Sequence, residues 1–133
     1  MPKDPEKSIT RLYTLLAKLP LEDYLSSKHF ADFCRRHDLT DTWKEHLDTA
    51  RDRPELYGKD STKNAFILFF HHLFQTRSCE FLMILTAFLQ DFREWNNGFP
   101  LPCAALQKEC VRMGFPDTSV EAEFSKVRNK RGS

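Results

Sequence analysis

Glycine is scarce in this chain, with 4 in 133 residues. Tight β-hairpins and the loops that wrap phosphate groups need glycine, because glycine adopts positive φ angles without a steric penalty. The single Asn-Gly pair, Asn97-Gly98, follows a long helical pattern and does not join two alternating segments. A strand-rich fold is therefore disfavoured.

A strong net charge and the common catalytic motifs are also missing. Twenty basic and nineteen acidic residues leave a formal net charge of +1, so no whole-molecule field attracts nucleic acid or an anionic membrane. The motifs G-x-S-x-G, G-x-G-x-x-G and H-E-x-x-H do not occur, and neither does the P-loop. We predict that the protein is not an enzyme and holds no cofactor or metal ion.

Cysteine pairing motifs are missing as well. Cys34, Cys79, Cys103 and Cys110 form no CxxC pair, and no basic-then-apolar signal segment follows the first methionine. Cys103 and Cys110 lie seven residues apart, which on a helix is about 10 Å along the axis and too far for one zinc ion. We predict reduced, mostly buried thiols and an intracellular location, cytoplasmic or nuclear.

What the chain does have is a central apolar stretch. Residues 64–90 carry two charges, Arg77 and Glu80, and form two apolar segments, Ala65–Phe74 and Cys79–Leu89, joined by four residues. Each segment is shorter than the roughly 18–20 residues that cross a bilayer, and each is apolar nearly all round. The pattern predicts a buried antiparallel helical hairpin without contact to a membrane.

Helix start and stop signals divide the rest of the chain. They predict helices at about 4–19, 26–37, 40–53, 62–75, 79–95, 102–113 and 118–127, with one further short turn at 21–25. Gly114 is predicted as a left-handed helix cap, and Thr118 with Glu121 as a capping box. The expected fold is all-α, a single-domain bundle of six or seven helices around the central hairpin. It spans residues 1–127, and residues 128–133 form a basic, disordered tail.

The adjacent histidines His71 and His72 lie within the first apolar segment. Neighbouring side chains on a helix point about 100° apart, so the pair is poorly placed to share one metal ion. We interpret both as packing residues. One alternative hypothesis stays open, an enzyme with a dispersed site around His71, His72, Cys79 and Glu80, which predicts a pocket with perturbed pKa values.

Aromatic residues near helix ends are the candidate partner-binding residues, because aromatic side chains are enriched among interface anchors and loops often carry recognition. These candidates, with one adaptable amide, are Trp43, Tyr57, Trp95, Asn97 and Phe99. We predict a non-catalytic interaction or adaptor domain that binds a protein or peptide partner in a groove between surface helices. Homodimerisation through an aromatic patch is a variant of the same hypothesis.

The main alternative is a nucleic-acid-associated helical domain. A basic patch at helix ends and in the C-terminal tail would contact phosphates in that case; its residues are Arg35, Arg36, Arg128, Lys130 and Arg131. Acidic residues such as Asp32 and Asp38 lie among them, and the net charge is near zero. An ordinary solvated surface is therefore favoured over a nucleic-acid contact.

Overall fold

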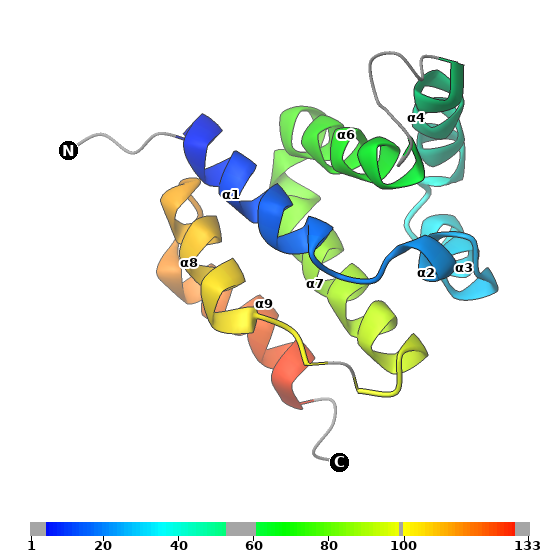
Figure 1. Ribbon diagram of the computed structural model, residues 1–133. Coiled ribbons are helices and arrows are strands. Elements are labelled where there is room, and N and C mark those ends of the chain that lie inside the picture. The colour runs from blue at the N-terminus through cyan, green and yellow to red at the C-terminus, as the bar shows by residue number, and fades with distance from the viewer. Residues whose placement is uncertain (1–4, 53–60, 99, 130–133) are drawn as a thin grey trace. The chain divides into compact units, whose positions relative to one another are not determined.

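The computed structural model describes residues 5–52, 61–98 and 100–129, and these residues form helices and connecting turns without any strand (Figure 1). The all-α prediction is confirmed. The helices are α1 (Pro5–Ala17), α2 (Glu22–Leu25), α3 (Lys28–Arg36), α4 (Thr40–Asp52), α6 (Ser61–Thr76), α7 (Ser78–Trp95), α8 (Cys103–Arg112) and α9 (Asp117–Asn129). The described ranges hold one helix more than predicted, because the short turn at 21–25 closes into α2.

The helices group into two compact units. Unit 1 contains α1, α7, α8 and α9, from the residues up to Leu19 and from Cys79 onward. Unit 2, Pro20–Ser78, contains α2, α3, α4 and α6. The boundary falls directly after the first residue of α7, so α6 and nearly all of α7 belong to different units. The hairpin pairing and the single-domain organisation therefore stay predictions.

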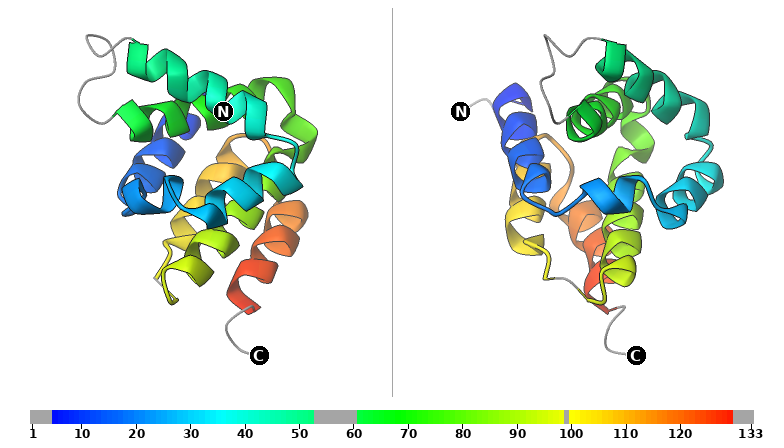
Figure 2. Two further views of the ribbon diagram at one scale, coloured as in Figure 1. Left: turned by 90° about the vertical axis from the view of Figure 1, so that its right-hand side faces the viewer. Right: turned by 45° about the vertical axis from the view of Figure 1, so that its right-hand side comes forward.

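Aromatic rings hold unit 2 together. In this unit α4 packs along α6, and α3 contacts both α2 and α4 (Figure 2). The Phe30 ring of α3 lies 5.4 Å from that of Tyr24 in α2, 5.1 Å from that of Trp43 in α4 and 6.3 Å from that of Phe66 in α6. Aromatic pairs at such distances add to the stability gained by apolar burial. One side chain therefore connects all four helices of the unit.

In unit 1, α8 contacts both α1 and α9 (Figure 1). The apolar helix α7 is buried along most of its length, as its composition predicts; its buried residues are Phe81, Leu82, Ile84, Leu85, Thr86, Phe88, Leu89, Asp91 and Phe92. Within the ranges that the structure describes, no helix combines the length and apolarity needed to cross a membrane.

Three helices end in the same left-handed turn. The second residue after each helix has a positive φ: 58° at Asp38, 52° at Asn97 and 112° at Gly114. After α8, the Gly114 N–H donates to the Val111 carbonyl at 3.0 Å and the next N–H donates to the Cys110 carbonyl at 3.2 Å. This is the Schellman pattern, which satisfies the last carbonyls of the helix. The prediction of a cap at Gly114 is confirmed.

The predicted capping box at Thr118 is wrong. Helix α9 begins at Asp117, and the Val120 N–H donates to the Pro116 carbonyl at 3.0 Å, so Thr118 lies inside the first turn. The helix starts earlier because the Pro116 carbonyl accepts its first hydrogen bond. The turn from α8 to α9 is consequently short, and the two helices lie beside each other.

Candidate functional site

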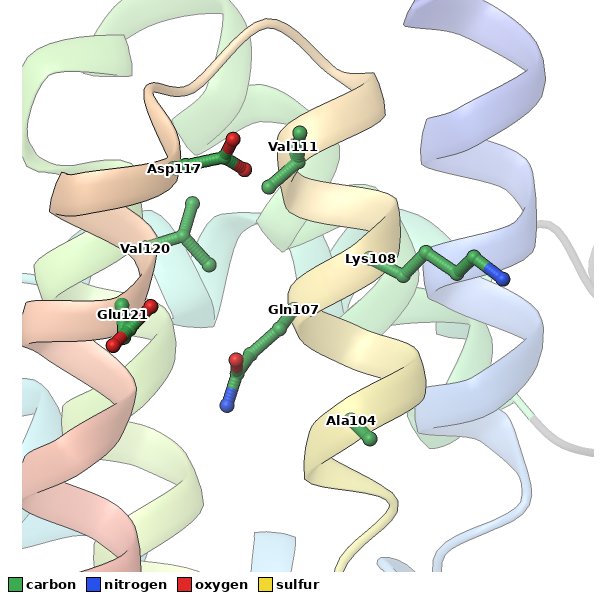
Figure 3. A pocket seen from close by; sticks show the side chains of 7 residues that line it. All are labelled: Ala104, Gln107, Lys108, Val111, Asp117, Val120 and Glu121. Carbon is green, nitrogen blue, oxygen red and sulfur yellow. The ribbon is translucent and has the colours of Figure 1, made fainter.

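A groove runs between α8 and α9 in unit 1, with a volume of about 370 Å³. Helix α8 contributes residues at i, i+3, i+4 and i+7, and α9 contributes residues at i, i+3 and i+4, so each helix offers one face. The lining residues are Ala104, Gln107, Lys108 and Val111 from α8 and Asp117, Val120 and Glu121 from α9. Figure 3 shows these side chains on the two helices, with Gln107 extending into the space between them.

The charges around this groove are unevenly placed. Asp117 and Glu121 are exposed carboxylates on the α9 side. Lys108 extends away from α9 in Figure 3, so its ammonium group points away from the two carboxylates. Val111 and Val120 lie between the polar groups. The groove thus holds two valines among polar side chains, with an acidic rim on one side.

One polar side chain at the groove is distinctive. The Nε2 atom of Gln107 is buried and has no hydrogen-bond partner among the residues that the structure describes. Figure 3 shows the Gln107 side chain reaching from α8 into the space between the helices. A buried donor without an acceptor costs free energy, so an acceptor brought into the groove would recover that cost.

A second groove, of about 290 Å³, lies between α4 and α6 in unit 2. It is lined by Glu45, His46, Thr49, Leu68, His71, His72 and Gln75. The His46 and His72 rings lie 5.1 Å apart. The Nδ1 atom of His46 donates to the Thr42 carbonyl at 2.9 Å, because a carbonyl can only accept. This bond orients the imidazole of His46.

The second groove offers little for nucleophilic chemistry. Its one hydroxyl, on Thr49, donates to the Glu45 backbone carbonyl at 2.9 Å. Cys79 and Glu80, the other members of the hypothetical dispersed active site, lie exposed at the start of α7 in unit 1. In the described part of the chain, no group of three or more His, Cys, Asp or Glu residues is placed to hold a metal ion.

Trp43, a predicted partner anchor, packs within unit 2. Its half-buried ring lies edge-on to Phe30, at 5.1 Å, and to Phe69, at 5.5 Å. We expect Trp43→Ala to lower the free energy of unfolding by about 1.5 kcal/mol, less than the 3–5 kcal/mol typical of a fully buried ring. Urea unfolding followed by circular dichroism measures this change. A shift below about 0.5 kcal/mol would contradict the packing role and favour a partner anchor.

Trp95 and Asn97 belong to unit 1 and lie at the end of α7. The half-buried Trp95 ring lies 6.1 Å from Phe92. Asn97 occupies the left-handed cap position, and the next N–H, of Gly98, donates to the Arg93 carbonyl at 2.8 Å. Asparagine tolerates this conformation better than most residues. Helix termination accounts for Asn97. Tyr57 and Phe99 lie outside the described residues.

The predicted basic patch is divided between the units. Arg35 and Arg36 are exposed near the end of α3 in unit 2, and Arg35 forms an ion pair with Asp32 one turn earlier. Arg128 lies in α9 of unit 1, and its side chain, like Lys130 and Arg131, falls outside the described residues. The α3 part of the patch is thus a mixed-charge surface of the ordinary kind.

The four cysteines are free thiols in two classes. Cys34 and Cys110 are buried, and burial raises the pKa of each thiol to about 12; the negative charge of Glu109 contributes to the second shift. Their neutral forms stabilise the fold below about pH 9, and that contribution is lost as the pH rises toward 12. Cys79 is exposed and Cys103 is partly exposed.

This difference predicts the order of thiol labelling. Because the thiolate is the reactive form, a disulfide reagent at pH 8 should modify Cys79 first, then Cys103, and the two buried thiols only after unfolding. Absorbance of the released thiol, with and without denaturant, measures the number of modified cysteines. Cys79→Ser should remove the fastest phase. Rapid labelling of all four thiols in the native protein would contradict the burial of Cys34 and Cys110.

The residues of the α8–α9 groove were not among the predicted site residues, which were chosen for aromaticity and basic charge. Spacing is the signal that could have indicated them. Ala104, Lys108 and Val111 repeat at helical intervals, as do Asp117 and Glu121, on two helices joined by the Gly114 turn. Spacing defines a face on each helix, but it leaves open which two faces meet.

Comparison of this chain with protein-family models, with curated proteins and with solved structures finds no match. A functional proposal therefore depends on the geometry described above.

Proposed function

We propose that this chain is a non-catalytic protein–protein interaction domain of an intracellular protein, which binds a partner segment in the groove between α8 and α9. The observation that carries the proposal is the groove itself: an alanine and two valines line a space between two helices, with charged residues at its edge. Amphipathic helices commonly bind proteins by placing an apolar face into such a groove.

Two further features support this function over catalysis and an extracellular role. Among the described lining residues there is no cysteine, histidine or serine, so the groove holds no Ser–His or Cys–His pair for nucleophilic catalysis. None of the four cysteines forms a disulfide, as is usual in a reducing compartment.

Selection of peptides tests the proposal directly. A phage library of helical peptides is selected against the protein, and the bound site is mapped by amide chemical shifts of the isotope-labelled chain. We expect the largest shifts in α8 and α9, at residues that line the groove. Shifts that cluster along α4 and α6 would move the docking site to unit 2, and a selection that enriches no binder would contradict the proposed function.

A matched pair of substitutions separates groove binding from general surface effects. Ala104 is exposed and lines the groove, whereas Ala122 is exposed on α9 and does not line it. Ala104→Gln adds a neutral, helix-compatible side chain to the groove, and we expect roughly tenfold weaker peptide binding, or about 1.4 kcal/mol. Ala122→Gln should leave the affinity unchanged. Equal effects of both substitutions would contradict binding in the groove.

A further inference from the structure

We propose that the segment bound between α8 and α9 is a basic amphipathic helix, with lysine or arginine residues four positions apart beside a narrow apolar face. The inference deepens the proposed function and depends on it. Its basis is the acidic rim formed by Asp117 and Glu121 beside the two valines that line the groove.

The charge of the rim determines the charge of the partner. The two exposed carboxylates lie on the α9 side, and Lys108, a cation among the described lining residues, extends away from α9 (Figure 3). An acidic segment, or the phosphates of a nucleic acid, would meet like charge at this rim. A cationic segment meets opposite charge, which speeds association and suppresses wrong partners.

The spacing of the two carboxylates determines the spacing in the partner. Asp117 and Glu121 are four residues apart in α9, so they lie about 6 Å apart along the helix axis. Side chains at i and i+4 of a partner helix have the same spacing and share one face. Two cations at those positions can therefore pair with both carboxylates at once.

Gln107 supplies a contact from the opposite helix. Its buried Nε2 has no acceptor among the described residues, and the side chain reaches into the space between α8 and α9 (Figure 3). A side-chain amide or hydroxyl oxygen on the partner's apolar edge can accept this hydrogen bond. The bound segment thus meets one donor on the α8 side and carboxylates on the α9 side, which sets its orientation about its own axis.

Substitutions that remove the rim charge test the inference. The peptide library is selected in parallel on the natural chain and on the Asp117→Asn, Glu121→Gln double variant. These changes keep the size of both side chains and leave a polar group in the first turn of α9. We expect the natural chain to enrich peptides with Lys or Arg four positions apart, and the double variant to bind those peptides roughly tenfold more weakly. Added salt should weaken binding to the natural chain and have little effect on the variant.

The control is another carboxylate on the same helix. Glu123 does not line the groove and pairs with Lys126 at 3.1 Å, so Glu123→Gln should leave peptide affinity unchanged. One outcome would overturn the inference and leave the proposed function intact. In that outcome the enriched peptides show no basic bias, Ala104→Gln weakens their binding, and the double variant binds them as tightly as the natural chain. Peptides insensitive to both sets of substitutions would overturn both.

Discussion

Replacing Phe30 with alanine should lower the free energy of unfolding of unit 2 by about 4 kcal/mol, because large-to-small changes of a buried ring remove apolar contacts and leave a cavity. The Phe30 side chain is 1% exposed, and its ring contacts Tyr24, Trp43 and Phe66 from the three other helices of the unit. Domains of this size are stable by only about 5–15 kcal/mol. The substitution therefore removes a large share of the total.

The two tryptophans provide separate probes of this loss. Trp43 lies in unit 2 and Trp95 lies in unit 1, so Trp95→Phe and Trp43→Phe variants each report the unfolding of one unit by fluorescence. In urea, we expect Phe30→Ala to lower the midpoint that Trp43 reports. If the Trp95 midpoint falls equally, the chain unfolds as one cooperative domain; if it does not move, the units unfold separately. This comparison tests the single-domain prediction.

Two control variants define the size of the effect. Met83 is exposed on α7, so Met83→Ala should change stability by less than about 0.5 kcal/mol. Phe30→Leu keeps much of the apolar volume and should give an intermediate loss. A Phe30→Ala variant as stable as the Met83→Ala variant would contradict the aromatic packing of unit 2.

Removing both arginines that face Glu109 should cost about 2.5 kcal/mol of unfolding free energy in unit 1. Glu109 is 7% exposed; its Oε2 accepts a bond from Arg112 at 3.2 Å, and its Oε1 lies 4.0 Å from Arg11 in α1. The longer contact is an ion pair without a hydrogen bond. A buried charge left unpaired costs about 3–5 kcal/mol. We expect less here, because both arginines are about half exposed and screened by solvent.

Removing Glu109 should lower the free energy of unfolding much less than removing its two arginine partners. Glu109→Met removes the buried charge and leaves two arginines that water can hydrate, so this change should be nearly neutral. Added to the Arg11→Ala, Arg112→Ala variant, Glu109→Met should restore most of the lost stability. Urea unfolding followed through Trp95 measures all four proteins. Glu109→Met alone could prove as destabilising as the loss of both arginines. In that case the lost stability comes from the attraction between Glu109 and the arginines, and the explanation by an unpaired buried carboxylate is wrong.

Most helix positions were predictable because their signals are local. Ser27 caps α3 by accepting a hydrogen bond from the Phe30 N–H at 3.4 Å, and Gly114 ends α8 in a left-handed turn. The misassigned start of α9 is also local in origin. Thr118 with Glu121 fits a capping box, but the Pro116 carbonyl already accepts the first hydrogen bond of the helix, from the Val120 N–H. When two possible helix starts lie within two residues of each other, only the backbone hydrogen bonds of the structure show which one begins the helix.

The candidate site was less predictable. Trp43 and Trp95 were chosen because aromatic side chains often anchor partners, yet both rings contact phenylalanines of their own unit. The groove residues Ala104, Gln107 and Val111 have no distinctive chemistry on their own. They become a candidate site because α9 lies beside them.

Composition and local pattern by themselves determined that this chain is helical and that its phenylalanine-rich middle is buried, since capping, turn geometry and apolar periodicity act over a few residues. Tertiary structure alone decided that the helices separate into two units between Ser78 and Cys79, and that the open groove lies between α8 and α9. The reason is physical: which faces meet depends on packing between residues distant in sequence, and such contacts leave no short-range pattern in the chain.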